Sequence, residues 1–558
     1  MRSHSPDVAH TDIMQTLPQG SDEVHDEVRD EVKPQKSKLQ SPPGKAALPD
    51  SETVSLKGWI AVLGSILGAF MAVLDIQITN ASLANILGSL GATLEEGSWI
   101  STSYLVAEII IIPLTAWLAV VFSTRWYLLA NSALFLCSSV LCALAWNLPS
   151  MIFFRALQGL TGGVLIPMAF NIILRVLPPS KRAIGFALFG VTATFAPAIG
   201  PTIGGYLTDS YGWPSIFYMN LAPGFVLMAA IWYAVDREPL RLGLLKKGDW
   251  WGVLCMAIGL GSLTTFLEEG NRKDWFGSEL ITWLGVLAAV FLTACLLIEF
   301  TRREPFLNLR LLGERNFALG SLVNVILGIG LYGVAFVLPL YLSQVQGYNA
   351  LQIGQTIMWL GIPQLFVLPF VPFLMKRLDA RVLITTGIVL FASSCFMNSL
   401  MTNSTAIDQL RWSQMVRALG SPLIFVPLTA LATGHINAEQ AGSASALFNM
   451  LRNLGGSIGI ATLSTLLTRR EQFHSLRIGE SVTVFDPATR QRLDQLASHF
   501  ASRGSDLVTA SSQALAAVGN VIRREAFVMA YNDAFLFIGS AMALSALVIW
   551  CCAPAKPA

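Results

Sequence analysis

The sequence predicts an all-α protein that crosses a membrane many times. Hydrophobic residues make up 53% of the 558 residues and charged residues only 13%, whereas a soluble domain carries roughly 25% charged residues. Apolar runs of about 20 residues, the length that a helix needs to cross the hydrocarbon core, recur along the chain. The net charge of +2 is too small to indicate a nucleic-acid partner.

Apolar runs account for most of the chain in order. Residues 1–57 are polar and charged, which predicts a disordered tail rather than a folded domain or a cleaved signal. Beyond the tail we count fourteen spans, centred near residues 68, 108, 136, 163, 196, 225, 259, 289, 329, 362, 392, 423, 455 and 542.

Basic residues predict the orientation of these spans. With the first span entering from the inside, the short inner loops hold fifteen Lys and Arg residues, while the short outer loops hold only Arg272, Lys273 and Arg411. Loops rich in Lys and Arg stay in the cytoplasm. Both termini are therefore predicted to be cytoplasmic.

The segment 468–530, before the last span, is then external. Asp486 and Pro487 are typical of a helix start, and Gly504 of a helix end. A second helix is expected from Asp506 towards Arg524. We interpret the segment as an external helical hairpin whose apolar stripe either meets a partner or packs within the hairpin.

An internal repeat divides the chain. The stretch "FFRALQGLTGGVLIPM" (153–168) resembles "MVRALGSPLIFVPLT" (415–429), and the two lie eight spans apart. Repeated halves are usual in secondary transporters. We therefore expect two six-span halves, 58–235 and 317–553, separated by two extra spans within 236–316.

Ionisable residues inside the spans are the first candidate site. Asp75, Glu108, Arg155, Arg417 and Arg452 fall at membrane depth, where a charge costs at least about 2.5–3.5 kcal/mol and usually marks function. A buried carboxylate beside an arginine can exchange a proton when its surroundings change. We favour such a role for Asp75, Arg155 and, less strongly, Glu108, over a structural ion pair. Arg417 and Arg452 are better explained as structural.

Several motifs carry a family resemblance. "LDIQITNASLA" holds Asp75 and Asn80, Arg155 and Gln158 form an R-x-x-Q-G motif, and "GWPSIFYMNLAPG" (212–224) is a further signature. In this order they resemble the major facilitator superfamily, and most closely its fourteen-span drug:proton antiporters of the EmrB type. The resemblance covers about residues 58–553 and implies the major facilitator fold.

Helix breakers in the fifth span add to the resemblance. "APAIGPTIGG" is similar to the antiporter motif of that span. Its glycines allow a neighbouring helix to approach closely, and its prolines bend the helix. The resemblance implies that this span is a gate, with the residues Pro197, Gly200, Pro201, Gly204 and Gly205.

The resemblance also implies a function. We expect proton-coupled export of hydrophobic or amphipathic toxic compounds across an inner membrane, with Asp75, Glu108 and Arg155 in proton coupling. Asn80, Gln158 and Gln364 are the expected polar lining of the substrate cavity. A periplasmic adaptor and an outer-membrane channel are the expected partners. The alternative is a narrow-range exporter of one metabolite, siderophore or organic acid.

Other classes of protein are disfavoured because the sequence lacks the motifs that they need. The six histidines form no nucleophile–base set, the seven cysteines show no metal spacing, and no phosphate-binding loop is present. We therefore expect neither an enzyme, a metal nor a cofactor.

One departure from the family pattern lies in the loop between the second and third spans. "AWLAVVFSTRW" keeps only Arg125 of the charged loop that normally latches the two halves.

Overall fold

The computed structural model describes residues 54–553 except 303–306, 435, 437–439 and 484. The predicted tail lies almost wholly outside the described residues. Within them every regular element is a helix. In the described part of the chain, twelve helices are long and apolar enough to cross a membrane, and a bent pair within residues 179–211, taken as one span, brings the number to thirteen. The protein is therefore a multi-pass membrane protein.

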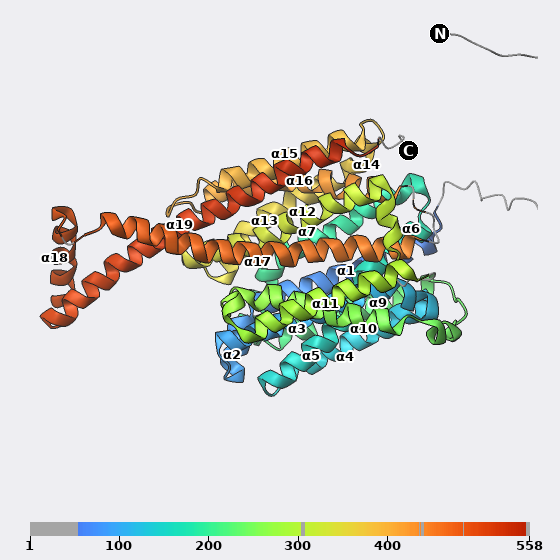
Figure 1. Cartoon of the computed structure of the whole chain (residues 1–558), viewed down its shortest axis with the longest axis horizontal. Coiled ribbons are helices and arrows are strands. Elements are labelled where there is room, and N and C mark those ends of the chain that lie inside the picture. Colours follow the sequence, from blue (N-terminus) through green and yellow to red (C-terminus); the bar gives the residue numbers. More distant parts are fainter. Residues whose placement is uncertain (1–53, 303–306, 435, 437–439, 484, 554–558) are drawn as a thin grey trace, which may run out of the picture. The chain divides into compact units, whose positions relative to one another are not determined.

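The first group of helices covers the predicted first half (Figure 1). These are α1 (Leu56–Ala81), α2 (Leu83–Leu90), α3 (Leu94–Phe122), α4 (Thr124–Ala143), α5 (Leu148–Gly162), α6 (Leu165–Val176), α7 (Pro179–Tyr211), α8 (Ser215–Tyr218) and α9 (Leu221–Ala234). Helix α1 packs against α6, α7 and α9, while α5 packs against α3 and α4.

The two extra spans are α10 (Trp250–Gly270) and α11 (Glu279–Thr301). They pack against each other, and α10 also contacts α3 and α17 (Ala441–Ser481). The loop after α10 is tied to α17, because Asn271 Nδ2 donates to Ser464 Oγ at 2.8 Å and Trp275 Nε1 donates to Thr465 Oγ1 at 3.0 Å. The extra pair thus touches helices from both ends of the sequence.

The last group begins after α11. Its helices are α12 (Arg315–Gln344), α13 (Ala350–Val367), α14 (Val371–Met375), α15 (Ala380–Asn398), α16 (Ile407–Thr433), α17, α18 (Pro487–Ala501) and α19 (Leu507–Trp550). Short 3-10 turns lie at 242–247, 275–277, 309–313 and 368–370. Helix α17, at the thirteenth predicted span, is not among the helices that qualify by apolarity, because polar residues such as Arg452 and Asn453 interrupt it.

Two helices continue far beyond the bundle and form an arm with α18 (Figure 1). The far part of α17, the helix α18 and the first part of α19 make up this arm. Asp533 on α19 links the two long helices. Its Oδ2 accepts a hydrogen bond from Arg470 Nε of α17 at 2.6 Å and lies 2.8 Å from His474 Nε2 of the same helix. The predicted second hairpin helix is therefore the start of α19, which runs without interruption into the last span.

The start of α18 follows from local chemistry. Asp486 is its N-cap and accepts a hydrogen bond from Thr489 N at 2.9 Å. This backbone hydrogen bond, with a second from the Thr489 hydroxyl, lowers the pKa of the Asp486 carboxyl. The apolar stripe of α18 faces α19 but stays half-exposed at Leu493, Leu496 and Phe500.

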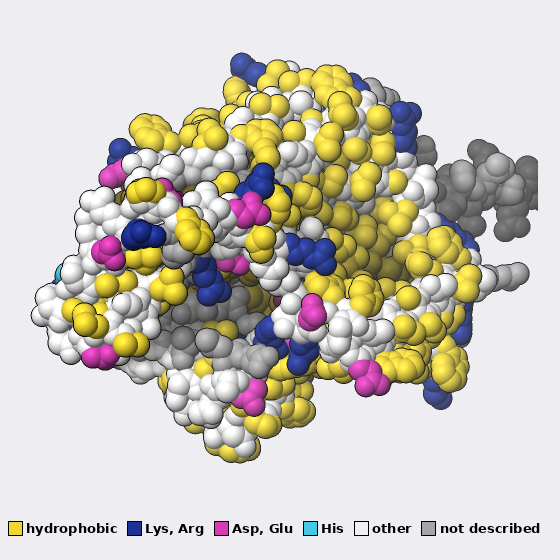
Figure 2. Space-filling model, turned by 60° about the vertical axis from the view of Figure 1, so that its left-hand side comes forward, with side chains coloured by type: hydrophobic (Ala, Val, Ile, Leu, Met, Phe, Trp, Pro, Cys, Tyr) yellow, Lys and Arg dark blue, Asp and Glu magenta, His cyan; other side chains and the backbone are white. Residues whose placement is uncertain are grey.

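We call the opposite end of the bundle, where α1 and α17 begin, the base. In Figure 2 hydrophobic side chains cover most of the visible flank of the bundle, whereas charged side chains gather over the arm, which faces the viewer, and at the right-hand edge. This distribution is that of a helix bundle whose sides face lipid.

Candidate functional site

The centre of the first group of helices is a buried polar network around Asp75. Arg155 Nη1 lies 2.6 Å from Asp75 Oδ2, and the side chains of Arg155 and Asp75 are 0% and 1% exposed. Helix α1 supplies the carboxylate and α5 the guanidinium. Two of the three predicted proton-coupling residues thus form one ion pair with almost no access to water.

Two amides hold the other oxygen of the carboxylate. Gln158 Nε2 donates to Asp75 Oδ1 at 3.0 Å, and Asn220 Nδ2 donates to the same atom at 2.6 Å. Both amides also reach Ser139 Oγ, at 2.8 Å and 3.2 Å. The carboxylate is therefore held by one cation and one amide from α5 and by a second amide from the turn before α9.

Aromatic rings shape the surroundings of the guanidinium. Arg155 lies over the Tyr104 ring, 4.4 Å from its centroid, and 5.9 Å from that of Phe217. Its Nε donates to Ile100 O at 3.4 Å, while its Nη2 has no hydrogen-bond partner among the described residues. Such a dry pocket strengthens the electrostatic attraction within the pair.

Sequence reasoning missed three members of this network: Ser139, Asn220 and Tyr104. Asn220 lies inside the quoted signature "GWPSIFYMNLAPG", so the motif held the signal, although a neutral amide carries no charge to flag it. Ser139 follows another serine and Tyr104 follows the polar stretch 101–103, and neither had a signal that set it apart from its neighbours. The side-chain amide oxygen of Asn220, Oδ1, has no hydrogen-bond partner among the described residues.

Glu108 lies apart from this network. It is 4% exposed on α3, beside Gly163 at the break between α5 and α6. Its carboxylate makes neither a hydrogen bond nor an ion pair with the described residues, and Arg452 and Arg155 are the cations that act on it electrostatically. Arg452 is held on α17 by Asn449 Oδ1 at 2.8 Å, with its Nη1 unpaired in the described chain.

The predicted cavity residues do not gather in one place. Gln158 belongs to the Asp75 network, whereas Asn80 is exposed at the end of α1 and accepts a hydrogen bond from Ser101 Oγ at 2.6 Å. Gln364 on α13 is 1% exposed, and both polar atoms of its amide lack partners within the described chain.

The glycine and proline motif lies directly against α1. Helix α7 bends by 47° between Pro197 and Ile199. Beyond the bend, a Cβ on Gly200 would lie 2.5 Å from the Gln77 side chain, and one on Gly204 would lie 3.1 Å from Ile78 O. Only glycine allows the two helices to approach this closely.

The opposite face of α7 meets the last group of helices. Gly354 on α13 lies against Thr202, so close that a side chain at 354 would overlap it. The bent helix is therefore sandwiched between α1, which carries Asp75, and α13, which carries Gln364.

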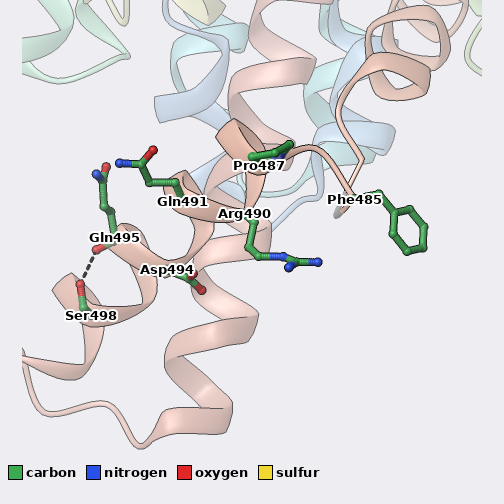
Figure 3. A pocket seen from close by; sticks show the side chains of 7 residues that line it. All are labelled: Phe485, Pro487, Arg490, Gln491, Asp494, Gln495 and Ser498. Atoms are coloured by element: carbon green, nitrogen blue, oxygen red, sulfur yellow. Dashed lines mark hydrogen bonds between the residues drawn. The ribbon is translucent and has the colours of Figure 1, made fainter.

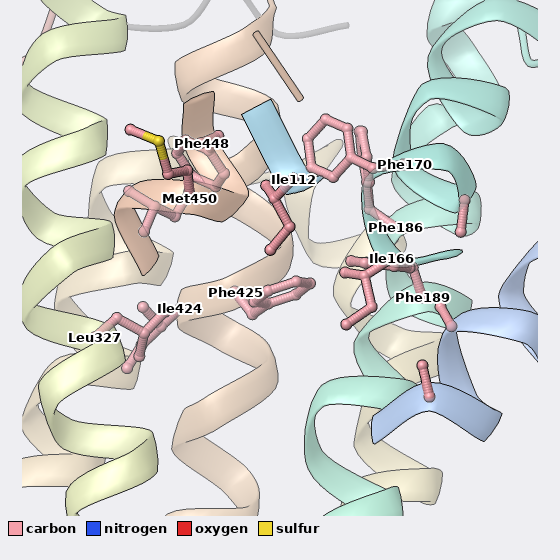
Figure 4. Close-up of a cluster of buried hydrophobic side chains, with 14 of the residues drawn as sticks. Ile112, Ile166, Phe170, Phe186, Phe189, Leu327, Ile424, Phe425, Phe448 and Met450 are labelled. Carbon is pink, nitrogen blue, oxygen red and sulfur yellow. The ribbon is translucent and has the colours of Figure 1, made fainter. Parts of the chain in front are cut away.

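Towards the base, aromatic side chains from both groups meet in a continuous layer (Figure 4). Phe170 on α6 faces Phe448 on α17 with ring centroids 6.2 Å apart, and Phe189 on α7 stacks on Phe425 of α16 at 6.0 Å. Ser445 Oγ donates to Pro167 O across the same boundary at 2.9 Å.

Comparison with known proteins decides the family. The model of the Major Facilitator Superfamily matches residues 65–460. The chain belongs to this superfamily. It is 32% identical over 490 residues to the colistin resistance protein EmrB of Acinetobacter baumannii, covering 88% of this chain and 95% of that protein.

Two more relatives place this major facilitator protein within its EmrB-type branch. The fatty acid resistance protein FarB of Neisseria gonorrhoeae is 32% identical, and the multidrug export protein EmrB of Escherichia coli is 31% identical. Each covers 88% of this chain and 94% of the relative. The chain is thus a small-molecule transporter and not an enzyme.

Solved structures agree with the fold. The human organic anion transporter MFSD10 gives a TM-score of 0.57 at 12% identity, covering 88% of this chain and 99% of that one. The proton:xylose symporter XylE gives 0.57 at 13% identity, covering 89% and 96%. At these identities the likeness concerns the fold alone.

Proposed function

We propose that this EmrB-type transporter exports hydrophobic or amphipathic toxic compounds in exchange for protons, by alternating access. The observation that carries the proposal is the fully buried Asp75–Arg155 pair. A carboxylate held in this way releases or takes up a proton when its cation or amide donors move away. Asp75 is the proposed proton carrier, Arg155 the residue that sets its affinity, and Glu108 a second carboxyl.

The contact between α1 and α7 supports coupling of the proton site to a gate. Asp75 lies less than one helical turn before Gln77 and Ile78, the residues that pack on Gly200 and Gly204. A helix moves largely as a rigid body, so a change in the bend of α7 shifts α1 and its carboxylate together.

The contacts at the base support a proposal for what replaces the missing charged latch. Arg125 is engaged within the first group, donating to Val235 O at 3.2 Å and lying over the Trp232 ring. We propose that the aromatic layer and the Ser445–Pro167 hydrogen bond close the base in place of the charged loop. Apolar contact suits a gate that must separate and reform.

The substrate class rests on the relatives and on the proposed cavity. The relatives are named for resistance to colistin and fatty acids and for multidrug export, which are amphipathic or chemically varied compounds. We propose that the substrate passes between the two groups of helices, near Gln158 and Gln364, with Asn80 at the outer end. The unpaired amide of Gln364 supports this assignment, because a buried amide needs a partner.

For the setting, we propose an inner membrane crossed by fourteen spans, α17 included, with both termini cytoplasmic. The halves are residues 58–235 and 317–553, with the extra spans in 236–316 and a cytoplasmic tail at 1–57. The arm at 468–530 would then be periplasmic and would dock an adaptor that leads to an outer-membrane channel.

A groove on the arm supports the docking surface (Figure 3). It has a volume of about 590 Å³, with Phe485 at one side and polar residues of α18 along the other. Phe485 is 86% exposed. An exposed aromatic ring beside polar side chains is typical of protein interfaces.

The test is substrate-induced proton movement in inverted membrane vesicles, reported by a pH-sensitive dye. Wild type should release protons from the lumen on addition of several unrelated lipophilic compounds, and Asp75→Asn should abolish this. Asp209→Asn is the matched control, because Asp209 is an exposed carboxylate on α7.

The outcomes separate the alternatives. A response to one metabolite, siderophore or organic acid alone would favour the narrow-range exporter. Normal proton release by Asp75→Asn together with its loss in Glu108→Gln would move the proton site to α3. Substrate movement without any proton movement would overturn the antiport proposal.

A further inference from the structure

Two acidic side chains meet at the base of the extra helix pair. Asp249 is the N-cap of α10, and its Oδ1 accepts from Gly252 N at 3.0 Å and faces Arg302 Nη2 at 3.3 Å. Glu299 lies in the last turn of α11, and its Oε2 accepts from Leu307 N at 3.3 Å. The two residues are 5% and 2% exposed. The protein itself therefore excludes water from both carboxylates.

Their remaining oxygens converge on one point. Asp249 Oδ2 and Glu299 Oε1 are buried and have no hydrogen-bond partner within the described chain. A Cβ on Gly252 would lie 2.6 Å from the first oxygen and 3.0 Å from the second. Both oxygens thus lie within 3.0 Å of one point, which the absent side chain of Gly252 leaves free.

The charges around this point do not balance. Arg302 is the described cation that faces the pair, and the other titratable groups close to it are the thiols of Cys255 and Cys295. Among the described residues, two ionised carboxylates against one guanidinium leave one uncompensated negative charge in a buried site. Carboxylates that share such a site cannot both remain ionised at low cost, so one keeps a proton.

A metal ion fits the site less well than a proton. The described residues contain no group of three acidic, histidine or cysteine side chains that could hold a metal. The other polar groups that reach the carboxylates are the N–H donors of Gly252 and Leu307, which cannot ligate a cation.

We propose that Asp249 and Glu299 form a binding site for a single proton, shared between Asp249 Oδ2 and Glu299 Oε1. The proton gives both unpaired oxygens a partner and joins the start of α10 to the end of α11. The site lies at the base, on helices other than those of the Asp75 network.

The test compares the pH dependence of unfolding in purified full-length protein. For wild type the unfolding midpoint should fall as the pH rises above about 5, where a carboxyl of the unfolded chain has released its proton, and should level off once the folded pair has released its own. Glu299→Gln supplies an amide donor in place of that proton. Its unfolding equilibrium should lack this component, which amounts to about a tenfold change per pH unit over the titrating range.

A matched control and a second readout accompany this measurement. Glu279→Gln changes an exposed carboxylate at the other end of α11 and should keep the wild-type slope. Infrared difference spectra between low and high pH should show one protonated carboxyl band in wild type, and this band should be missing in both Glu299→Gln and Asp249→Asn. The second variant keeps an N-cap residue.

Two results would overturn the proposal. One is an equal pH slope for wild type and Glu299→Gln. The other is a wild-type midpoint that rises with sodium or potassium at constant pH while that of the variant does not, which would make the ligand a monovalent cation. If Asp249→Asn does not fold, the comparison of wild type with Glu299→Gln decides the question alone.

Discussion

Replacing Arg155 by methionine tests the energetics of the buried pair. The change removes the cation but keeps an unbranched side chain, and it leaves the Asp75 carboxylate with the amides of Gln158 and Asn220 as its donors. Because the two side chains are 0% and 1% exposed and their charged atoms lie 2.6 Å apart, the pair belongs to the fully desolvated class. Removing one partner of such a pair costs about 3–5 kcal/mol.

The assay is equilibrium unfolding in mixed micelles, followed by tryptophan fluorescence, for Arg155→Met, Asp75→Asn and the double variant. The double variant removes both charges, so it should lose about 2–3 kcal/mol less than the sum of the single losses. Arg477→Met is the control. It breaks a 2.9 Å pair with Glu480 whose side chains are 74% and 56% exposed, a class that contributes about 0–1 kcal/mol.

The reasoning is refuted by either of two results. Arg155→Met could prove as mild as Arg477→Met, which would mean that water reaches Asp75 and compensates the lost cation. Alternatively, the losses of the single variants could add in the double variant, which would mean that the two side chains do not stabilise each other.

Two further predictions concern other parts of the molecule. Gly200→Leu should push α7 from Gln77, lowering stability by about 1–3 kcal/mol and slowing efflux, whereas Gly479→Ala, with open space around it, should stabilise α17 slightly. Because hydrogen bonds from Thr489 lower the pKa of Asp486, its contribution to the stability of α18 is present above about pH 4 and is lost as the pH falls further. The protection factors of residues 487–501, which are exchange rates corrected for the intrinsic pH dependence of amide exchange, should therefore fall below that pH in wild type, and unchanged protection factors would contradict this.

The bundle was largely predictable because lipid imposes one rule on every span. Apolar runs of sufficient length place the helices, and Asp486 and Gly504 place α18, since capping acts within a few residues. Capping and breaker residues in the sequence do not show how far a helix continues beyond a membrane span. Nothing in residues 468–480 ends α17, and nothing in 524–532 separates the arm from the last span, so both helices extend through the predicted boundaries.

The candidate site was predictable where charge marks it. Asp75 and Arg155 stand out in apolar runs, and the structure brings them together with Gln158. Asn220 and Ser139 are neutral and short, so their role appears only when α4 packs against α5 and α9 and the turn before α9 brings Asn220 to Asp75. The sequence repeat between Arg155 and Arg417 also conceals a difference in pairing. Arg417 bonds to Gln414 on its own helix and has no carboxylate partner among the described residues.

The unbroken course of α17 makes the arm mechanically continuous with the centre of the transporter. At 1.5 Å per residue this helix is about 60 Å long, and it carries Ser445 and Phe448 at the base, Arg452 at mid-depth and Ser481 at the tip. A tilt of about 10° at the base would move the tip by roughly 10 Å, as on any rigid lever of that length. By thermodynamic reciprocity, a partner that grips the tip in one position also biases which state the base adopts. A protein bound at the tip would therefore respond to the state of the base and would shift the equilibrium between its closed and open forms.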